Sequence, residues 1–513
     1  MVPEELARVL EEFLADARDA VVLEDGKVIF DFGRARYSVS AQRGKCLLHL
    51  WSEERNTVRR VLDCEARNGV LRLSVQRFGQ ARPSKLEICR ERDRRAPSER
   101  HLTRMRYLRL LERVLERECP GWTVESLSSA MDLERSFGPI YARGLVRRGG
   151  SAFAVLGVNA DEPQAAVDAS LTIALLWLDL CRGRATRSVV EGLKLFLPAG
   201  SSAIVRERMA HLNHAAAKFE LHELDEREET LAEVDCRDRG NIATRLVQCP
   251  DREHAYRRFA DSIARILALV PKAEVAPLSA AEVAFRLHGL EFARARLAPH
   301  RGSFENEEEI VFGAGPCEFP LTEKNIAQCG EFLRRLAAAR RPQGDRADPL
   351  WRMQPERWLE SLVVRDVAAL DARLDAAAVY SQVPAFSASD RAMIDVLGVT
   401  RDGRLAVLEL KADEDLHLPL QGLDYWARVA WHHQRGEFRR FGYFPGRELS
   451  PQAPLLFLVT PALHVHPTTD TLLRYLSPDI DCTLLAIHEN WREELRVIFR
   501  KRPDTALPAT AAS

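Results

Sequence analysis

The sequence predicts a multidomain α/β protein with a mixed sheet flanked by helices near its carboxyl end. Three observations predict this fold class. Two consecutive apolar strands, residues 393–399 and 405–411, are joined by a polar turn and carry charged side chains. An earlier ten-residue segment, 153–162, repeats the pattern of the second strand. Short strands separated by turn residues also follow one another at the amino end, which is typical of a small β-rich domain.

The 513 residues are long enough for several domains with cores of their own, and 46% are hydrophobic. The first of these domains is a β-rich module over residues 1–100. An amphipathic helix at 3–19 begins it, and a small barrel or curled sheet follows. The strands expected in it are 27–32, 35–39, 46–51, 57–64 and 70–78.

Positive charge is concentrated in this module and just after it. Residues 26–110 contain 21 Lys and Arg against 9 Asp and Glu, whereas the whole chain has a net charge of −1. Arginines interleaved with aromatic residues can pair with phosphates and stack on bases, so we expect a nucleic-acid-binding module. An ordinary Arg-rich surface over an aromatic core is the alternative. The candidate arginines are Arg34, Arg36, Arg55, Arg59 and Arg60.

The second domain, residues 101–235, contains an internal echo of the later strands. Segment 153–162 aligns with 405–414, which sets Gly157 against Glu409 and Asn159 against Lys411. Upstream, 109–112 echoes 357–360, so that a helix Glu persists, and Arg143 takes the place of Asp395. We interpret this domain as a second copy of the later fold with its charged site dismantled, and Arg143 as suited to a phosphate backbone or a partner. Chance similarity between two buried strands is the alternative.

The remaining chain is divided into a connecting domain, a carboxyl-terminal α/β domain and a tail. Residues 236–345 are predicted to be mostly helical, with a helix–strand order that resembles a reduced copy of the amino-terminal module. Residues 346–502 form the α/β domain, and 503–513 a disordered tail. The helices expected in the connecting domain are 255–270, 279–298 and 323–340.

The charged residues on the two apolar strands are the candidate site. Side chains alternate along a strand, so Glu409 and Lys411 share a face, and Asp395 lies on the neighbouring strand. Two adjacent carboxylates resist shared ionisation, and a divalent cation, Mg²⁺ or Mn²⁺, removes that conflict. A nearby ammonium can orient or help deprotonate a metal-bound water and stabilise charge on a phosphate. The arrangement predicts phosphodiester hydrolysis.

A Glu–Lys ion pair on a half-exposed strand would explain the same residues without a function. The composition weighs against it, because only nine of the 74 basic residues are Lys. Arg would serve a surface pair equally well, whereas water activation requires a compact ammonium. Lys411 is therefore unexpected as a merely structural cation.

Together these motifs resemble the PD-(D/E)XK nuclease superfamily, in particular its RecB-type and mismatch-endonuclease-like branch. The resemblance covers roughly residues 350–490. The leading Pro of the usual signature is absent, since Ala392-Met393 precede Ile394. The matching residues are Leu359-Glu360, Gln382-Val383-Pro384, Ile394-Asp395, Val407-Leu408-Glu409-Leu410-Lys411, Gln421 and Tyr425.

The resemblance implies a restriction-endonuclease-like core over 346–502 and a degenerate nuclease-like domain over 101–235. It implies that Mg²⁺ or Mn²⁺ is bound by Asp395, Glu409 and the Leu410 carbonyl, and that Lys411 serves the nucleophilic water. Glu360 would complete the outer side of the site, Gln421 would position Lys411 or the phosphate, and Tyr425 would contact nucleic acid.

The expected function is a metal-dependent DNA endonuclease acting in repair, recombination or defence. A catalytically inactive nucleic-acid-binding or regulatory protein is the alternative, and RNA stays open as a substrate. No P-loop motif occurs, so a helicase or translocase would be a separate partner. A homodimer would let one site per chain cut two strands.

Cysteine usage and the amino end predict a cytoplasmic location. The ten Cys include no C-x-x-C pair, so structural zinc is not expected, and no secretory pattern opens the chain. The apolar run 171–178 is too short to cross a bilayer and is expected to be a buried helix, so no membrane partner is predicted.

Overall fold

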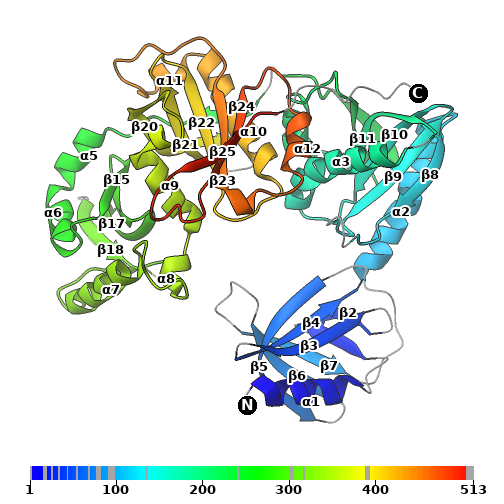
Figure 1. The fold of residues 1–513 in the computed structure, drawn as a ribbon, viewed down its shortest axis with the longest axis horizontal. Helices are drawn as coiled ribbons and strands as arrows, with labels where there is room; N and C mark the ends of the chain where they lie inside the picture. Colours follow the sequence, from blue (N-terminus) through cyan, green and yellow to red (C-terminus); the bar gives the residue numbers. More distant parts are fainter. Residues whose placement is uncertain are drawn as a thin grey trace. The chain divides into compact units, whose positions relative to one another are not determined.

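The structure is a computed structural model. It describes residues 3–503 except 16–19, 25–26, 33–34, 43, 53–55, 68–69, 77–82, 90–98, 133–136, 186, 240–241, 300–305, 316–317 and 388–392. The expected tail lies outside the described residues from residue 504 onward. The chain divides into two compact units, Met1–Arg206 with Ala217–Cys236, and Glu207–Ala216 with Arg237–Ser513. Each unit combines an antiparallel sheet and a mixed sheet (Figure 1).

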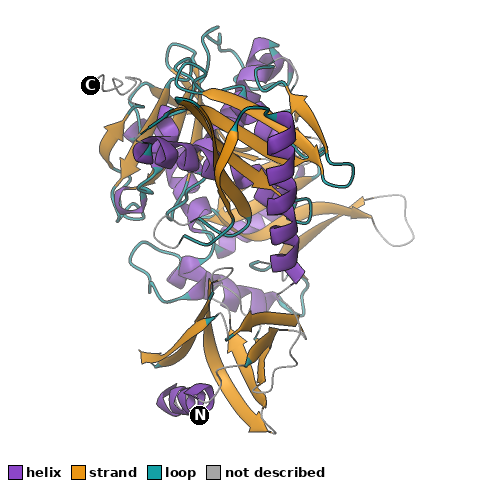
Figure 2. Ribbon diagram, turned by 90° about the vertical axis from the view of Figure 1, so that its right-hand side faces the viewer, coloured by secondary structure: helices purple, strands orange, loops and turns teal. Residues whose placement is uncertain are grey.

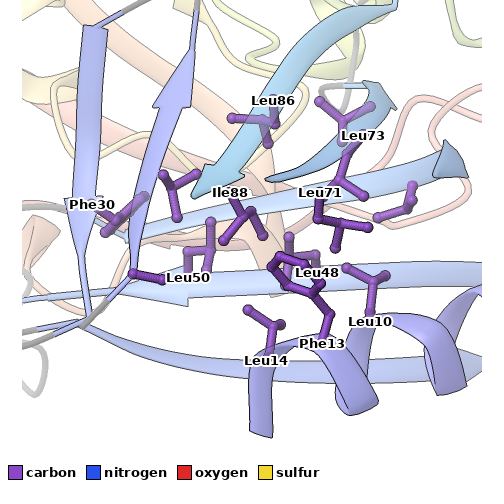
Figure 3. Packing of buried hydrophobic residues seen from close by; sticks show 14 of the residues in the cluster. Leu10, Phe13, Leu14, Phe30, Leu48, Leu50, Leu71, Leu73, Leu86 and Ile88 are labelled. Carbon is purple, nitrogen blue, oxygen red and sulfur yellow. The ribbon is translucent and has the colours of Figure 1, made fainter. Parts of the chain in front are cut away.

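The amino-terminal sheet is antiparallel and covered on one face by helix α1 (Pro3–Ala15) (Figures 1 and 2). Apolar residues alternate along the strands, so one face of the sheet is lined with leucines. Leu10, Phe13 and Leu14 of α1 point towards these leucines (Figure 3). The strand order is β2-β1-β7-β6-β5-β4-β3, so the described strands form an open sheet rather than a barrel. The strands are β1 (Val21–Glu24), β2 (Lys27–Asp31), β3 (Arg36–Gln42), β4 (Lys45–Trp51), β5 (Asn56–Arg67), β6 (Val70–Gln76) and β7 (Ser84–Cys89).

The second sheet of unit 1 is mixed, in the order β13-β12-β11-β10-β9-β8. Strands β8, β9 and β10 are antiparallel, β10, β11 and β12 are parallel, and β13 is antiparallel to β12. Parallel neighbours require a crossover, and helices α3 and α4 supply it. The elements are α2 (Glu99–Glu118), β8 (Thr123–Ser128), β9 (Tyr141–Arg148), β10 (Ser151–Val158), α3 (Gln164–Arg184), β11 (Val189–Pro198), α4 (Ala203–Met209), β12 (Lys218–Asp225) and β13 (Thr230–Val234).

Helix α3 extends well beyond the predicted apolar run 171–178. Among the described helices it is the one long and apolar enough to cross a membrane, by length and composition alone. More than half of its most apolar window is buried inside the protein, and it packs against β10 and β11. A core helix under a sheet has the same composition, so the apolar residues of α3 are explained by this packing.

The mixed sheet of unit 2 has the order β14-β20-β21-β22-β23-β24-β25. The strands predicted at 393–399 and 405–411 are confirmed as β21 and β22. The elements are β14 (Thr244–Leu246), α8 (Pro349–Arg352), α9 (Pro355–Arg365), η1 (Val367–Ala369), β20 (Leu374–Ser387), β21 (Met393–Thr400), β22 (Leu405–Leu410), α10 (Leu418–Gln434), α11 (Glu437–Arg440), β23 (Leu455–Pro461), η2 (Ala462–His464), α12 (Thr469–Arg474), β24 (Cys482–Ile487) and β25 (Val497–Lys501).

Strands β20–β25 repeat the order and directions of β8–β13. In both sheets three antiparallel strands lead into three parallel ones, and an antiparallel strand follows. The register corrects one sequence alignment. In unit 2, Val396 pairs with Leu408, so the next position along each strand sets Asp395 opposite Glu409. In unit 1, Gly157, which aligns with Glu409, pairs with Ala142. Ala142, not Arg143, therefore takes the position of Asp395.

The connecting domain is not mostly helical. A five-stranded antiparallel sheet fills its centre, and the expected helix 279–298 is a hairpin of β16 and β17. Val283, Phe285 and Leu287 alternate and are buried, and the His288-Gly289 turn, with both φ angles positive, reverses the chain. The elements are α5 (Arg252–Arg258), α6 (Ala260–Leu269), β15 (Glu274–Ser279), β16 (Glu282–Leu287), β17 (Leu290–Pro299), β18 (Asn306–Phe312), β19 (Phe319–Pro320) and α7 (Ile326–Ala339).

Arg340 joins this antiparallel sheet to the mixed sheet of unit 2. Its side chain is 1% exposed, and its guanidinium lies 4.7 Å from the centre of the Trp358 ring on α9. Burial lowers the pKa of Arg340 to about 9, so the group stays charged at neutral pH. The guanidinium donates hydrogen bonds to the carbonyls of Leu287, His288, Leu350, Met353 and Gln354.

We expect Arg340→Met to destabilise unit 2 by about 3 kcal/mol or more, because several buried carbonyls lose a charged donor at once. Arg341→Met is the matched control, since Arg341 is exposed. Urea unfolding followed by tryptophan fluorescence measures both. Equal stabilities of the two variants would contradict this account.

His288 is expected to make unit 2 less stable in acid. Burial, then Arg365 and Arg340, lower its pKa to about 4, and its ring stacks on Trp358 at 5.0 Å. The unfolded chain therefore binds the extra proton between about pH 6.5 and pH 4, and stability falls as the pH falls through that window. From pH 7 to pH 5 the wild type should lose about 2 kcal/mol more than His288→Asn, since Asn tolerates the positive φ.

The measurement is the free energy of unfolding at the two pH values for both proteins. His254→Gln, at an exposed position, is the control and should follow the wild type. An identical pH dependence of the wild type and His288→Asn would show that His288 is not the group responsible.

Candidate active site

Asp395 and Glu409 meet where β21 and β22 lie side by side. The Leu410 amide donates a hydrogen bond to Asp395 Oδ2 at 3.1 Å, and the charge of Asp395 acts directly on the Glu409 carboxyl. Glu409 is 2% exposed, and among the described residues its Oε2 is buried without a hydrogen-bond partner. The strands thus hold two carboxyls together out of water.

This burial disfavours ionisation of the pair. Burial raises the pKa of Glu409 well above its usual range, and the charge of Asp395 raises it further. Burial also raises the pKa of Asp395, although the Leu410 amide opposes that effect. Both shifts mean that two adjacent carboxylates are unfavourable here, and a nearby cation would relieve that conflict.

Lys411 follows directly after β22 and places an ammonium beside Glu409. Its Nζ lies 3.7 Å from Glu409 Oε1, 3.7 Å from Glu356 Oε1 and 3.5 Å from Asp415 Oδ2. Burial disfavours the ammonium, but the surrounding carboxylates outweigh it and raise the pKa of Lys411. Lys411 is therefore held as an ammonium, which suits charge stabilisation and water orientation better than the proton abstraction considered from the sequence.

Glu360 lies on α9 and is 5% exposed. Its Oε2 accepts hydrogen bonds from Arg357 at 2.6 Å and from Gln382 at 2.7 Å. Burial raises the pKa of Glu360 to about 7, with Arg357 opposing and Asp395 adding to the effect. Gln382 has a φ of 53°, a left-handed conformation that costs about 1 kcal/mol for a residue with a side chain.

Helix α10 brings two predicted residues to the same place. Gly422 permits the close approach, because a Cβ there would lie 3.6 Å from the Glu409 Cβ and would clash with Leu458. Gln421 Oε1 is buried without a hydrogen-bond partner among the described residues. Burial, and then the charges of Glu409 and Asp395, raise the pKa of Tyr425, which places its hydroxyl within reach of their field.

Several residues of the site were not predicted. Glu356 and Asp415 contact Lys411, and Arg357 and Gln382 contact Glu360. The spacing carries a signal for Glu356, which lies four residues before Glu360 on α9, but not for Asp415, which lies in the loop before α10. Gln382 belongs to the matched motif, but no role was predicted for it. In the structure its side-chain amide donates a hydrogen bond to Glu360.

Two side chains are placed to hold a divalent cation, Asp395 and Glu409. Among the described residues no group of three or more His, Cys, Asp or Glu side chains is arranged to hold a metal ion. The unpartnered Oε2 of Glu409 nevertheless fits a cation, because a buried carboxylate oxygen needs a positive partner. The Leu410 side chain is buried in the core and turned to the opposite face from Glu409.

A cleft begins beside Glu360. A cavity of about 340 Å³ is lined by Arg357, Gln382 and Arg286, and a second one of about 690 Å³ shares Arg286 and Gln382. Both lie between the β16–β17 hairpin and the mixed sheet of unit 2. Asp395, Glu409 and Lys411 line neither of these two cavities, whereas Arg357 and Gln382, the hydrogen-bond partners of Glu360, line the first.

The predicted nucleic-acid-binding arginines are divided between surface and core. Arg36 is exposed and Arg60 half-buried, whereas Arg59 is 8% exposed and pairs with Glu24 at 3.6 Å. Arg34 and Arg55 lie outside the described residues. Arg143 is 6% exposed, lies 4.9 Å from the Phe137 ring centre and donates to the Ala130 carbonyl. Arg59 and Arg143 thus serve the interior in this arrangement, because each has an internal partner.

The comparisons with known proteins are sparse. No protein-family model matches the chain, and no curated protein matches it in sequence. A solved structure of EndoMS in a complex with dsDNA is similar, with 14% sequence identity and a TM-score of 0.18. The similarity covers 44% of this chain and 95% of that chain. Because this likeness is weak, function has to be argued from the geometry of the site.

We expect Glu409→Gln to stabilise unit 2 by about 1–3 kcal/mol in EDTA, because the amide removes a buried carboxylate that has no partner for one oxygen. Added Mn²⁺ should raise the unfolding temperature of the wild type and leave that of the variant unchanged. Thermal unfolding measures both effects, with the exposed Glu494→Gln as control. A loss of stability of Glu409→Gln in EDTA would contradict this reading of the site.

Proposed function

We propose that this chain is a Mg²⁺- or Mn²⁺-dependent endonuclease that hydrolyses phosphodiester bonds in DNA. One observation carries the proposal: Asp395, Glu409 and Lys411 meet at the end of a hairpin, and a buried oxygen of Glu409 lacks a partner. Carboxylates crowded together with an ammonium suit cation-assisted attack of water on a phosphate. In a purely structural ion pair, buried oxygens are usually hydrogen-bonded.

The residues have separate tasks in this proposal. A divalent cation bound by Asp395, Glu409 and the Leu410 carbonyl would polarise the phosphate and lower the pKa of water. The Leu410 amide holds Asp395 in place, and the Lys411 ammonium orients water and stabilises negative charge on the phosphate oxygens.

Glu360 and helix α10 complete the arrangement. Arg357 and Gln382 fix Glu360 at the side of the site next to the cleft. Gln421 has a buried oxygen that could accept a hydrogen bond from Lys411 or from water, and the charges of Glu409 and Asp395 act on Tyr425. These groups orient the reacting atoms without taking part in bond breaking.

The substrate and setting follow from the same proposal. The basic amino-terminal region and the exposed Arg36 suit a nucleic-acid backbone, and DNA is the substrate we propose, with RNA as an arm of the test. The role would be in repair, recombination or defence in the cytoplasm, with a separate helicase or translocase and a homodimer as candidate partners. We further propose that β8–β13 is a degenerate copy of the nuclease-like sheet, supported by its equal strand order.

We expect Lys411→Ala to lower the cleavage rate by about 100-fold or more, because the developing charge on the phosphate loses its ammonium. The assay uses a panel of end-labelled single-stranded, mismatched, branched and perfect duplex DNA, with an RNA arm, in Mn²⁺. Equal cleavage by wild type and variant would overturn the proposed site. Binding without turnover by the wild type would favour a regulatory protein instead.

A further inference from the structure

The two mixed sheets share strand order and directions, but their charged residues differ. In unit 2 the ends of β21 and β22 carry Asp395, Glu409 and, one residue beyond β22, Lys411. In unit 1 the strands that correspond to them are β9 and β10. Whether unit 1 can cut therefore depends on what stands at the positions that correspond to those three residues.

Each of those positions in unit 1 has lost its charge. Gly157 stands where Glu409 does, and its strand partner is Ala142 rather than an Asp. Asn159 stands where Lys411 does, is 2% exposed, and its Oδ1 accepts a hydrogen bond from the Asp161 amide at 3.0 Å. The strand ends of unit 1 hold no carboxyl pair and no ammonium at these positions.

The space that Glu409 fills in unit 2 is occupied in unit 1 by side chains of α2. A Cβ placed on Gly157 would lie 2.5 Å from the Tyr107 Oη and 2.8 Å from a methyl carbon of Leu111. Tyr107 is 3% exposed and Leu111 is fully buried, and they are four residues apart, as Glu356 and Glu360 are on α9. Tyr107 and Leu111 thus fill the space beside Gly157.

The acidic residues that remain near β10 are engaged elsewhere. Glu112, which the sequence alignment set against Glu360, is exposed. Glu162 forms an ion pair with Arg104 at 3.0 Å, and Glu226 accepts a hydrogen bond from the Ala160 amide. None of these three carboxylates takes the position of Asp395 or Glu409.

We infer that one chain hydrolyses only one strand of a duplex per binding event and releases a nick. This inference rests on the proposed function, because it concerns the product of the same site. Water adds to phosphorus, and one phosphorus–oxygen bond to a sugar breaks. The bonding pair leaves on the sugar oxygen, which takes up a proton from the water. After one strand is cut, the same site has to move to the other strand before it can cut again, and among the described residues only the strands of unit 2 carry the three charged groups. A homodimer would bring two such sites together, and the test distinguishes that case.

The test follows a supercoiled plasmid, and a duplex with a different dye on each strand, in Mn²⁺ with the full chain. Nicked circles should accumulate first, and linear DNA should follow only after a lag from independent second nicks. Linear product at the initial rate of nicking would overturn the inference. So would an initial rate of linear product that rises with the square of protein concentration, because two chains would then supply two sites.

Variants at corresponding positions of the two mixed sheets show which sheet is needed for nicking. Lys411→Ala should lower nicking by at least 100-fold, whereas Asn159→Ala should stay within about twofold of the wild type. A drop of more than tenfold in a folded Asn159→Ala protein would overturn the inference. No cleavage of any substrate by the wild type would overturn the proposed function itself.

A binding measurement does not depend on cleavage. Calorimetric titration with Mn²⁺ should show binding that Asp395→Ala abolishes and Asn159→Ala retains. Such a result without turnover would support the asymmetry of the two sheets while the proposed function fails. Undiminished binding by Asp395→Ala would overturn the assignment of the cation to unit 2.

Discussion

The repulsion between Asp395 and Glu409 is the constraint on which the site depends. The hairpin forces both carboxyls to one place, burial raises the pKa of each, and one ammonium cannot neutralise them together with Glu356 and Asp415. The fold stays stable despite this repulsion because the neighbouring strands contribute buried apolar residues to one core. A buried charge cluster of this kind weakens the unbound protein, and that cost is typical of sites selected for binding rather than for stability.

Rigid support for this cluster comes from a neighbouring sheet. Arg340 bonds the β16–β17 turn to the segment that starts α9, and α9 carries Glu356 and Glu360. The strained backbone of Gln382 then turns an amide towards Glu360. The antiparallel sheet of unit 2 is thus part of the support of the candidate site, although none of its strands contributes one of the predicted catalytic groups.

The sequence was most informative where periodicity and chemistry agreed. The hairpin around Asp395 and Glu409 was predictable from two apolar runs and a polar turn. Residues 279–298 were expected to be helical and instead form a hairpin, although many of them are Ala, Leu, Glu or Arg, which have high helix propensity. Cross-strand pairing overrode that propensity. The placement of Arg143 was wrong by one residue because the two hairpin turns differ in length, which an ungapped alignment does not reveal. The burial of Arg59 depends on folded contacts that composition does not record.

Tyr107 and Leu111 limit what the carboxyl end of β10 can accept. A Gly157→Glu substitution would meet a filled interior and be destabilising. A carboxylate at that position would therefore also need smaller side chains on α2, so one substitution is not enough to give the unit 1 strands the charged residues that the unit 2 strands carry.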